Sequence, residues 1–527
     1  MGLVHCCSAL LLLVFIPKGC HGGNMLVLPA DGSHWLNMDI LIKALHSRGH
    51  NVTVVRSSRS WYIKEKSSYY NTYTVQVERS IDQKFITKLI SESLKFERGA
   101  IPLTSFLNAA VGMIGVFVDA HTTVGELVSA MLDDKQLMRT LKDSKFDMVL
   151  TDPCWGHGVI LAKYLNLPLV YNVRWLLSGE AHLAIAPSPL SYIPITGSGH
   201  TDTMTFFQRV KNVLYQLNNL IQHQVVVKLV YQKLCDKYLG SDIDFNQLLL
   251  GADIWLMRVD FVFEFPRPTM PNVVYIGGFQ CKPAKPLPEH LEEFVQSSGE
   301  HGVIIMSLGS FVSELPSDMA NGIAATFAKL PQRVIWRYTG PRPATLGNNT
   351  LMVDWMPQND LLGHPKIKLF VAHGGTNGVQ EAIYHGVPVV GLPLFFDQFD
   401  NLLRLKERGA AKLTTIRTVD QGNTFQDAIQ EVLNEPSYRL NMQRLSRLHR
   451  DQPMKSLDTA LFWIEFVMRH KGAAHLRTES YRLPWYSYHS VDVILFLVGA
   501  LLLVIFTFFI FIRCLCTTMC KSKVKRD

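Results

Sequence analysis

A glycine-rich stretch, VAHGGTNG at residues 371–378, holds the residue types that most directly suggest chemistry. It follows an apolar run of strand length and precedes VQEAIYHG, which has a helical pattern. The first turn of a helix leaves backbone N–H groups unpaired and has a partial positive charge, and glycines let an anion approach the backbone closely. His373, Thr376 and Asn377 add polar side chains to such a turn. The stretch therefore predicts a phosphate-binding site.

Two common phosphate-binding motifs do not fit this stretch. HGGTNG lacks the G-x-G-x-x-G spacing of dinucleotide-binding folds, which argues against an oxidoreductase, and no lysine follows it as in a P-loop. A structural turn that binds nothing would explain the glycines alone. It would not explain the three polar side chains.

The elements that must position this turn alternate between strands and helices. The chain opens with the strand pattern NMLVLP, the loop ADGSHW, the helical pattern LNMDILIKALHSRG and the strand pattern NVTVVR. A similar order restarts near Gly302 with GVIIMSLGS and continues to VPVVGLP. Such alternation predicts an α/β fold with parallel sheets and ligands at the carboxyl ends of strands. The proline-rich CKPAKPLPEH, residues 281–290, predicts a stiff linker between the two halves.

Both ends of the chain have the composition of targeting segments. The apolar core from Ala9 to Ile16 is shorter than the ~20 residues needed to cross a bilayer, and small residues follow it, which predicts a signal peptide over 1–23. Residues 493–512 contain no charge, and at ~1.5 Å per residue they span the ~30 Å hydrocarbon core. We expect a single transmembrane helix there.

The tail at 513–527 is basic, whereas WYSYHSVD before the apolar segment is aromatic. The positive-inside rule then predicts a cytosolic tail and a lumenal body, which is a type I single-pass protein. Lys523 and Lys525 resemble the dilysine retrieval motif of endoplasmic-reticulum membrane proteins. Simple stop-transfer charges are the alternative interpretation of both lysines.

The number of cysteines and the distribution of charge argue against a disulfide-stabilised protein and against a nucleic-acid-binding protein. Only Cys154, Cys235 and Cys281 fall in the predicted lumenal body, so a large core rather than a disulfide framework must hold it together. Part of the net charge of +8 lies in the tail, and no basic block or nucleic-acid motif occurs elsewhere. We expect no nucleic-acid partner. The roughly 470 residues between the ends predict two domains.

From Trp355 to Gln398 the chain reads WMPQNDLLGHPKIKLFVAHGGTNGVQEAIYHGVPVVGLPLFFDQ. This segment resembles the sugar-nucleotide box of UDP-glycosyltransferases, specifically vertebrate UDP-glucuronosyltransferases, because W-x-x-Q, H-x-G-x-N-x-x-x-E and D-Q stand at the family spacings. The resemblance extends beyond the box, through SLGS, PSYRLNMQRLSRLHRDQP and FWIEFVMRHKGA, to the apolar segment and basic tail, and it covers essentially the whole chain. It implies a GT-B fold, in which two Rossmann-like domains face each other and a late helix crosses back to the first. The predicted boundaries are 24–280 for an acceptor-binding domain, 281–290 for the linker, 291–450 for a UDP-sugar-binding domain and 451–492 for the return helix and juxtamembrane segment.

The resemblance also implies a role for each residue of the box. Trp355 resembles the residue that stacks on uracil, for which an indole face is suited, and Gln358 resembles the one that holds the nucleoside. Glu381 resembles the carboxylate that accepts hydrogen bonds from the ribose hydroxyls. The implied diphosphate contacts are Ser310, His373, Thr376 and Asn377, with Gly375 in the same donor turn, and the implied sugar contacts are Asp397 and Gln398.

His34, in the loop ADGSHW, stands where the catalytic base of the family stands. Transfer of a hexose to a hydroxyl needs a base, and a histidine side chain titrates near neutral pH. Asp152, at the end of FDMVLTD, resembles the acid that orients this base. The implied reaction is one inverting displacement that needs no metal and no other cofactor. Without the resemblance, hydrogen bonding within a loop is an equal interpretation of His34, and we expect His157 to be structural.

The sequence says less about which sugar is transferred and which acceptor receives it than about the nucleotide. Arg258 matches the position where glucuronosyltransferases hold a cation for the sugar carboxylate; Arg267 is a competitor, and a surface arginine is the plain interpretation of Arg258. The D-Q pair also accommodates neutral hexoses, so UDP-glucose, UDP-galactose and UDP-N-acetylglucosamine stay open. The apolar segments 100–125 and 176–195 suggest lipophilic acceptors.

The sequence thus predicts an endoplasmic-reticulum enzyme that transfers glucuronic acid from UDP-glucuronic acid to a hydroxyl of a lipophilic phenol, steroid or xenobiotic in the lumen. The alternatives are a lumenal hexosyltransferase of lipids and a catalytically silent UDP-sugar-binding membrane protein, against which His34 and Asp152 argue. Asn348 in GNNT is a glycosylation candidate, whereas Asn51 begins a strand and is expected to be folded away. Homo- and hetero-oligomers both stay open.

Overall fold

The computed structural model describes residues 22–82, 85, 87, 90, 93, 94, 103–176, 179–309, 312 and 314–524. The chain divides into two compact units, residues 1–476 and 477–527. Most of the predicted signal peptide, together with Ser310 and Lys525, lies outside the described residues.

The first half of unit 1 is built on a parallel sheet of seven strands in the order β3-β2-β1-β4-β5-β8-β9. Its strands β4, β5 and β8 are buried over their whole length and are mostly apolar, as expected for a parallel sheet covered on both faces. The strands are β1 (Asn24–Leu28), β2 (Asn51–Ser57), β3 (Asn71–Val75), β4 (Met148–Thr151), β5 (Leu169–Val173), β8 (Ile254–Met257) and β9 (Val273–Tyr275), and a short hairpin adds β6 (Trp175–Leu176) and β7 (Gly179–Glu180).

The helices of this half are α2 (Ser33–Ser47), α4 (Leu103–Asp133), α5 (Lys135–Asp143), α6 (His157–Leu165), α7 (Ala181–Ile185), α8 (Phe206–Val226), α9 (Gln232–Tyr238) and α10 (Phe245–Leu250), with a π turn at Val227–Tyr231. One boundary differs from the sequence-based expectation. ADGSHW was expected to be a loop, but α2 begins at Ser33 inside it because Gly32, with φ of 73°, supplies the sharp entry to the helix. His34 therefore lies in the first turn of a helix.

The second half of unit 1 repeats the arrangement with six parallel strands in the order β12-β11-β10-β13-β14-β15. The strands are β10 (Val303–Ser307), β11 (Arg333–Arg337), β12 (Thr350–Val353), β13 (Ile367–Ala372), β14 (Val389–Gly391) and β15 (Ala411–Leu413). The helices are α11 (Glu289–Gln296), α12 (Ser317–Ala328), α13 (Gln358–Leu362), α14 (Thr376–His385), α15 (Gln398–Glu407), α16 (Thr424–Asn434) and α17 (Pro436–Arg450). The prediction of two parallel α/β sheets is confirmed.

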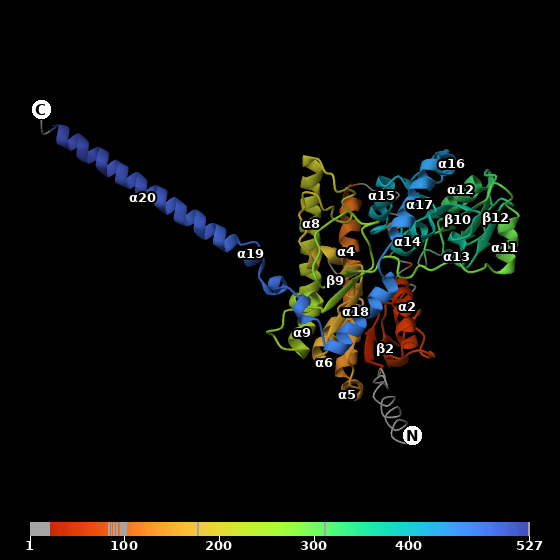
Figure 1. The fold of residues 1–527 in the computed structure, drawn as a ribbon, viewed down its shortest axis with the longest axis horizontal. Coiled ribbons are helices and arrows are strands. Elements are labelled where there is room, and N and C mark those ends of the chain that lie inside the picture. Colours follow the sequence, from red (N-terminus) through yellow and green to blue (C-terminus); the bar gives the residue numbers. More distant parts are fainter. Residues whose placement is uncertain are drawn as a thin grey trace, which may run out of the picture. The chain divides into compact units, whose positions relative to one another are not determined.

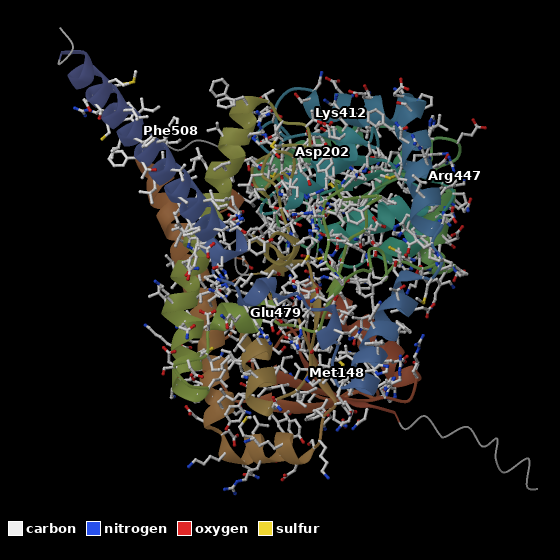
Figure 2. All side chains as sticks on the ribbon, turned by 60° about the vertical axis from the view of Figure 1, so that its left-hand side comes forward. Met148, Asp202, Lys412, Arg447, Glu479 and Phe508 are labelled. Carbon is white, nitrogen blue, oxygen red and sulfur yellow. The ribbon has the colours of Figure 1, made fainter. Side chains whose placement is uncertain are left out.

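The helix α18 (Ser456–His470) follows the second sheet in sequence but packs on the first. Its Ala460, Ile464 and Val467 share a buried cluster with Leu41 and Leu45 of α2, and Figure 1 shows α18 in blue near the red α2. Side chains fill the interior around both sheets: in Figure 2 the fully buried Met148 of β4 marks the first core, while Arg447 projects outward from α17. Cys154, Cys235 and Cys281 are free thiols, as expected for a body held by its core.

Unit 2 contains α19 (Trp485–Tyr488) and the long α20 (Val491–Val524). By length and composition, Val491–Met519 could cross a membrane. The helix extends beyond the predicted span of 493–512 and includes most of the basic tail, with Lys523 in its last turn.

Candidate active site

The strand order of the first sheet brings His34 and Asp152 together. The two residues lie just beyond β1 and β4, which are adjacent parallel strands, so both stand at the same edge of the sheet. The Nδ1 atom of His34 is 2.6 Å from Oδ2 of Asp152. The imidazole is 26 % exposed, whereas the carboxyl group is 1 % exposed. A buried acid that orients a partly exposed imidazole is the arrangement of a general base and its partner.

Arg258, just after β8, completes this group. Its Nη2 atom is 3.3 Å from Oδ2 of Asp152 and 3.4 Å from Nδ1 of His34. Burial of Asp152 would raise its pKa, but the contacts with His34 and with the Arg258 cation outweigh it and hold the pKa at about 2. Asp152 is therefore ionised at neutral pH and can accept a hydrogen bond from the Nδ1–H group of His34. The Nε2 atom of His34 is then unprotonated and free to take a proton.

The interpretation of Arg258 as a surface residue is wrong, because the side chain is 6 % exposed. One side of its guanidinium pairs with Asp152, while Nη1 is buried without a hydrogen-bond partner among the described residues. That nitrogen could receive a sugar carboxylate, so the predicted role of Arg258 stays open. The competitor Arg267 is engaged elsewhere, with Nη1 3.2 Å from Glu180 and Nη2 3.2 Å from Ser188.

His34, Asp152 and Cys154 also have the composition of a metal site, since their ligand atoms lie within 4.8 Å of one another. Two features of these residues disfavour a metal ion. The Arg258 cation already contacts two of the three groups. Burial raises the pKa of the Cys154 thiol well above its usual value, so a metal ion would have to displace the proton of a neutral thiol.

The chain has one D-x-D spacing, the type that metal-dependent transferases use, at Asp242 and Asp244. Asp244 is the N-cap of α10, where its carboxylate accepts a hydrogen bond from the backbone of Gln247. The motif has a structural role at this helix start.

The glycine-rich turn connects β13 to α14, as the sequence predicts. Gly374 has φ of 93°, and a Cβ there would meet the backbone oxygen of Gln398 at 2.6 Å. A Cβ on Gly375, the residue before α14, would meet Nε2 of His373 at 2.4 Å. Side chains are thus excluded where an anion must reach the first N–H groups of α14.

The polar side chains of this turn differ in their surroundings. Burial lowers the pKa of His373 to about 4, so the ring is neutral at pH 7 and the helix N-terminus must balance a phosphate charge. Thr376 Oγ1 lies 3.5 Å from Asp397 Oδ2. Asn377 Oδ1 accepts a hydrogen bond of 3.1 Å from Asn37 of α2, one helical turn after His34. The glycine-rich turn and the helix that contains His34 therefore touch.

The predicted nucleoside contacts lie beside this turn. Nε2 of Gln358, the first residue of α13, is 2.5 Å from Oε2 of Glu381 in α14. Burial raises the pKa of Glu381 to about 7 in spite of that hydrogen bond. The Trp355 ring is 65 % exposed, and the guanidinium of Arg337 lies 5.8 Å from its centroid. The ring is thus available to stack on a base.

The predicted sugar contacts stand at the start of α15. Asp397 is its N-cap residue, and its Oδ2 accepts a hydrogen bond of 2.7 Å from Asn401. Gln398 is 5 % exposed, and its Oε1 accepts hydrogen bonds from the backbone of Leu394 and Phe395. Only the amide nitrogen of Gln398 is left for a sugar hydroxyl. These assignments stay predictions.

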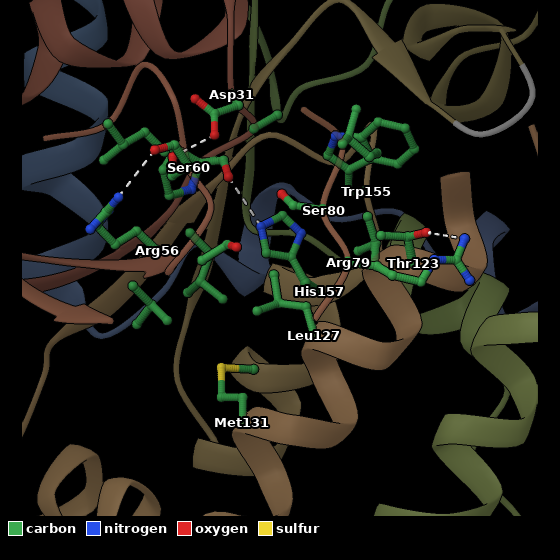
Figure 3. Close-up of a pocket in the computed structure, with 18 residues that line it drawn as sticks. Asp31, Arg56, Ser60, Arg79, Ser80, Thr123, Leu127, Met131, Trp155 and His157 are labelled. Atoms are coloured by element: carbon green, nitrogen blue, oxygen red, sulfur yellow. Dashed lines mark hydrogen bonds between the residues drawn. The ribbon is translucent and has the colours of Figure 1, made fainter. Parts of the chain in front are cut away.

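A cavity of about 70 Å³ lies between the end of β1 and α4 (Figure 3), and neither His34 nor Asp152 lines it. Asp31, Arg56 and Trp155 line it, as does His157, whose Nε2 is 3.2 Å from the backbone oxygen of Pro29. Of the two predicted acceptor segments, 100–125 contributes Thr123 and Val124, whereas the described residues of 176–195 do not line this cavity.

The sequence-based reasoning missed Asn401. Its amide nitrogen donates to both Asp397 and the backbone oxygen of Gly374, which joins the sugar end of the site to the glycine-rich turn. The available signal was the spacing D-Q-x-x-N, because residues four apart share one face of a helix.

Comparison with known proteins agrees with this geometry. Residues 23–526 match the family model described as UDP-glucoronosyl and UDP-glucosyl transferase. The chain is 43 % identical over 483 residues to UDP-glucuronosyltransferase 2A2 of Mus musculus, with 90 % of each chain covered. It is 44 % identical over 510 residues to UDP-glucuronosyltransferase 2A2 of Homo sapiens, with 95 % of this chain and 92 % of the human protein covered.

Solved structures show the same fold at low sequence identity. The calicheamicin glycosyltransferase CalG4 has a TM-score of 0.57 and 17 % identity, with 85 % of this chain and 98 % of that chain covered. A UDP-glucosyltransferase from Polygonum tinctorium has a TM-score of 0.56 and 17 % identity, with 85 % and 99 % covered. These are GT-B glycosyltransferases, so the predicted fold class is confirmed. Together with the family match over nearly the whole chain, this establishes that the protein belongs to the family of UDP-glucuronosyl and UDP-glucosyl transferases.

Proposed function

We propose that this protein transfers glucuronic acid from UDP-glucuronic acid to a hydroxyl group of a lipophilic small molecule, with inversion at the anomeric carbon. The relatives are named UDP-glucuronosyltransferases. The observation that carries the chemistry is the pairing of His34 with the buried Asp152 at 2.6 Å, on a helix that also contacts the donor turn through Asn37.

In the proposed reaction, Nε2 of His34 takes the proton of the acceptor hydroxyl as its oxygen attacks the anomeric carbon. The ionised Asp152 holds the Nδ1 proton and stabilises the imidazolium that forms. The bond from the anomeric carbon to the diphosphate oxygen breaks, and UDP leaves with the electron pair. The unpaired N–H groups at the start of α14 offset the charge of UDP, so the displacement needs no metal.

Donor binding is assigned to the residues of the second sheet. Trp355 would stack on uracil, Glu381 would accept hydrogen bonds from the ribose, and Asp397 would bind the sugar, with Ser310 as a further diphosphate contact. The proposed domains are 24–280 for the acceptor and 291–450 for the donor. The proposed linker at 281–290 is coil as far as residue 288, and its last two residues begin α11.

The proposed location is the endoplasmic-reticulum membrane, with the catalytic body in the lumen and the tail at 513–527 in the cytosol. α20 is long and apolar enough to be the anchor, and Lys523 and Lys525 are the proposed retrieval signal. Asn348 is exposed in a turn, which suits glycosylation. Asn51 is also exposed, contrary to expectation, although its amide is hydrogen-bonded to Asn24 and Asn71.

A second feature suits a membrane-bound enzyme with lipophilic acceptors. α8 turns its polar residue Asn212 inward, where it is fully buried and bonded to the backbone of residues 190–195. Its apolar side chains face outward: Phe206, Phe207, Val210, Val213, Leu214, Leu217, Leu220, Ile221 and Val225. Residues 203–235 contain four Lys or Arg residues and no Asp or Glu, a composition that favours an anionic lipid surface. We assign this face to the bilayer.

The membrane contact can be tested with the full chain in nanodiscs that contain brominated lipids. A fluorophore attached at Leu217→Cys should be quenched, whereas one at Arg447→Cys, on the exposed side of α17, should not. Equal quenching at both positions, or at neither, contradicts the assignment.

The main test is a product assay with membranes that contain the full chain, a pool of phenols and steroids, and a panel of UDP-sugars. The wild type should form glucuronides from UDP-glucuronic acid, and His34→Ala should not. His46→Ala, which removes an exposed histidine near the end of the same helix, is the matched control and should be active. Transfer of a neutral hexose alone would support the hexosyltransferase alternative, and UDP binding without transfer would support the silent protein.

A further inference from the structure

Five charged side chains are buried together where α15 meets the first half of unit 1. This group, the arginine–glutamate cluster, consists of Arg174, Glu180, Glu264, Arg267 and Arg404, and each side chain is between 2 % and 6 % exposed. Arg404 comes from α15, and the other four come from the segment between β5 and β9. The cluster therefore joins the two sheet-containing halves of the enzyme.

The ion pairs of the cluster are short and shared. Arg174 lies 2.6 Å from Glu264 and 3.0 Å from Glu180. Arg404 lies 3.0 Å from each of the same two carboxylates, and Arg267 lies 3.2 Å from Glu180. Removing five charges from water is costly, and such groups are weak contributors to net stability. A role in orienting nearby residues of the site explains the burial of these five charges better than a contribution to stability does.

The cluster reaches the sugar end of the site through Asn401, which is fully buried. The Oδ1 atom of Asn401 accepts hydrogen bonds from Arg174 at 3.2 Å and from Arg404 at 3.4 Å. Its Nδ2 atom donates to the backbone oxygen of Gly374 at 2.9 Å and to Asp397 at 2.7 Å. A guanidinium can only donate, so the amide oxygen must face the arginines and the nitrogen must face Asp397. The arginines thereby fix the orientation of the amide.

We propose that Arg174 is a positioning residue, which reaches from the acceptor half of the enzyme, fixes the amide of Asn401 and so holds Asp397 and the Gly374 carbonyl in place for the donor sugar. This inference rests on the proposed function, because it takes Asp397 to be a sugar contact. It makes sugar binding depend on the packing of the two halves. The uridine part of the donor, by contrast, is assigned to Trp355, Gln358 and Glu381, and the diphosphate to the turn before α14, so the affinity for UDP should depend on Arg174 much less than the affinity for the whole donor.

The chain offers a matched pair of variants. The cluster has three guanidinium groups and two carboxylates, so either Arg174→Met or Arg267→Met leaves two arginines for two glutamates. Methionine is flexible enough to fill the space of the lost side chain. Both arginines contact Glu180, but only Arg174 contacts Asn401. Arg174 also pairs with Glu264, so a difference between the variants reports on Asn401 or Glu264 and not on the net charge of the cluster, and Asn401→Ala then separates these two contacts.

The experiment measures the Kd of the full-length protein in nanodiscs for UDP and for UDP-glucuronic acid, together with thermal stability. Arg174→Met should weaken UDP-glucuronic acid binding about five- to tenfold, the effect of a lost hydrogen bond, and leave the Kd for UDP within about twofold. Arg267→Met should change neither. Asn401→Ala should resemble Arg174→Met, and the double variant should be no weaker than Asn401→Ala, because both changes act through one amide.

Two results would overturn the inference. Equal weakening of both ligands by Arg174→Met indicates a structural role, and equal effects of Arg174→Met and Arg267→Met indicate a role of cluster charge. Wild-type turnover in the same preparation tests the proposed function separately. Because the readout is binding, the inference is tested even if the protein transfers no sugar.

Discussion

Asp152 on the acceptor side is a buried carboxylic acid and Glu381 on the donor side a half-buried one, and their pKa values are shifted in opposite directions. Asp152 contacts His34 and the Arg258 cation, and these contacts hold its pKa at about 2. Glu381 has the neutral amide of Gln358 as its hydrogen-bond partner, and burial raises its pKa to about 7. The charge of the neighbours, not burial alone, decides which acid is permanently ionised.

This difference matches the two proposed tasks. The acid behind a catalytic base must stay ionised through every turnover, because it stabilises the imidazolium that forms on His34. The acid that accepts hydrogen bonds from a ribose needs its charge only while the donor is bound. Mutations on the acceptor side should therefore chiefly lower the rate of sugar transfer. Mutations on the donor side should chiefly change the affinity for UDP and the pH dependence of that affinity.

The largest expected effect is on the acceptor side. His34→Ala removes the group that takes the hydroxyl proton and should lower kcat about 10³-fold at pH 7, while the Kd for UDP stays unchanged. The imidazole is partly exposed, so folding should be intact, which a thermal melt would verify. Steady-state kinetics and UDP titration of the same membranes measure both quantities. If His34→Ala also weakened UDP binding, the proposed separation between an acceptor side that sets the rate and a donor side that sets the affinity would be wrong.

Arg258→Met should give the next largest effect. It removes the cation that helps to keep Asp152 ionised and should lower kcat/KM about 30-fold or more for every UDP-sugar. If the unpaired Nη1 atom of Arg258 receives the sugar carboxylate, the loss with UDP-glucuronic acid should exceed the loss with UDP-glucose. Arg267→Met is the control, because Arg267 pairs with Glu180 instead. If kcat/KM fell equally with both UDP-sugars, Arg258 would act only by keeping Asp152 ionised and would not bind the sugar carboxylate.

The donor side should show a pH dependence that the acceptor-side acid cannot produce. With the pKa of Glu381 raised to about 7, the ionised fraction increases about tenfold between pH 6 and pH 8, and ribose hydroxyls bind the ionised form. Affinity for UDP should therefore fall as pH is lowered through 7. Glu381→Gln should bind weakly at both pH values. Isothermal titration with UDP at pH 6 and pH 8 measures the slope, and an unchanged slope in Glu381→Gln would point to another group.

The same comparison explains which parts of the site could be predicted from the sequence. The donor turn is local, since β13, Gly374, Gly375 and α14 follow one another in the chain, so its composition was enough to predict a strand, a sharp turn and a helix start. The catalytic pair is 118 residues apart in sequence. Alternating strands and helices predicted a sheet edge, but only the family resemblance singled out His34 and Asp152 as partners.

Other features depend on the packing of the two halves and leave little trace in the sequence. Arg174, Glu264 and Arg404 meet only because α15 packs against the segment after β5, and as isolated residues they suggest ordinary surface charge. The start of α2 at Ser33 was missed because Gly32 has the left-handed geometry that permits a sharp entry to a helix. Tertiary contacts determine the first feature, and the backbone conformation of one glycine determines the second.

The smallest expected effect concerns Trp355, whose ring is 65 % exposed and contributes little to folding. Trp355→Ala should weaken UDP about fivefold, the lower range for loss of one base–aromatic stack, and leave the melting temperature unchanged. Trp355→Phe, which keeps a flat ring, should recover most of the affinity. Neither variant should change kcat, because the ring would stack on uracil, whereas the acceptor hydroxyl is activated by His34 across the site. A drop in kcat with Trp355→Ala would show that base stacking also sets the position of the anomeric carbon. The acceptor side would then not be the only side that determines the rate, and the donor side would determine more than the affinity.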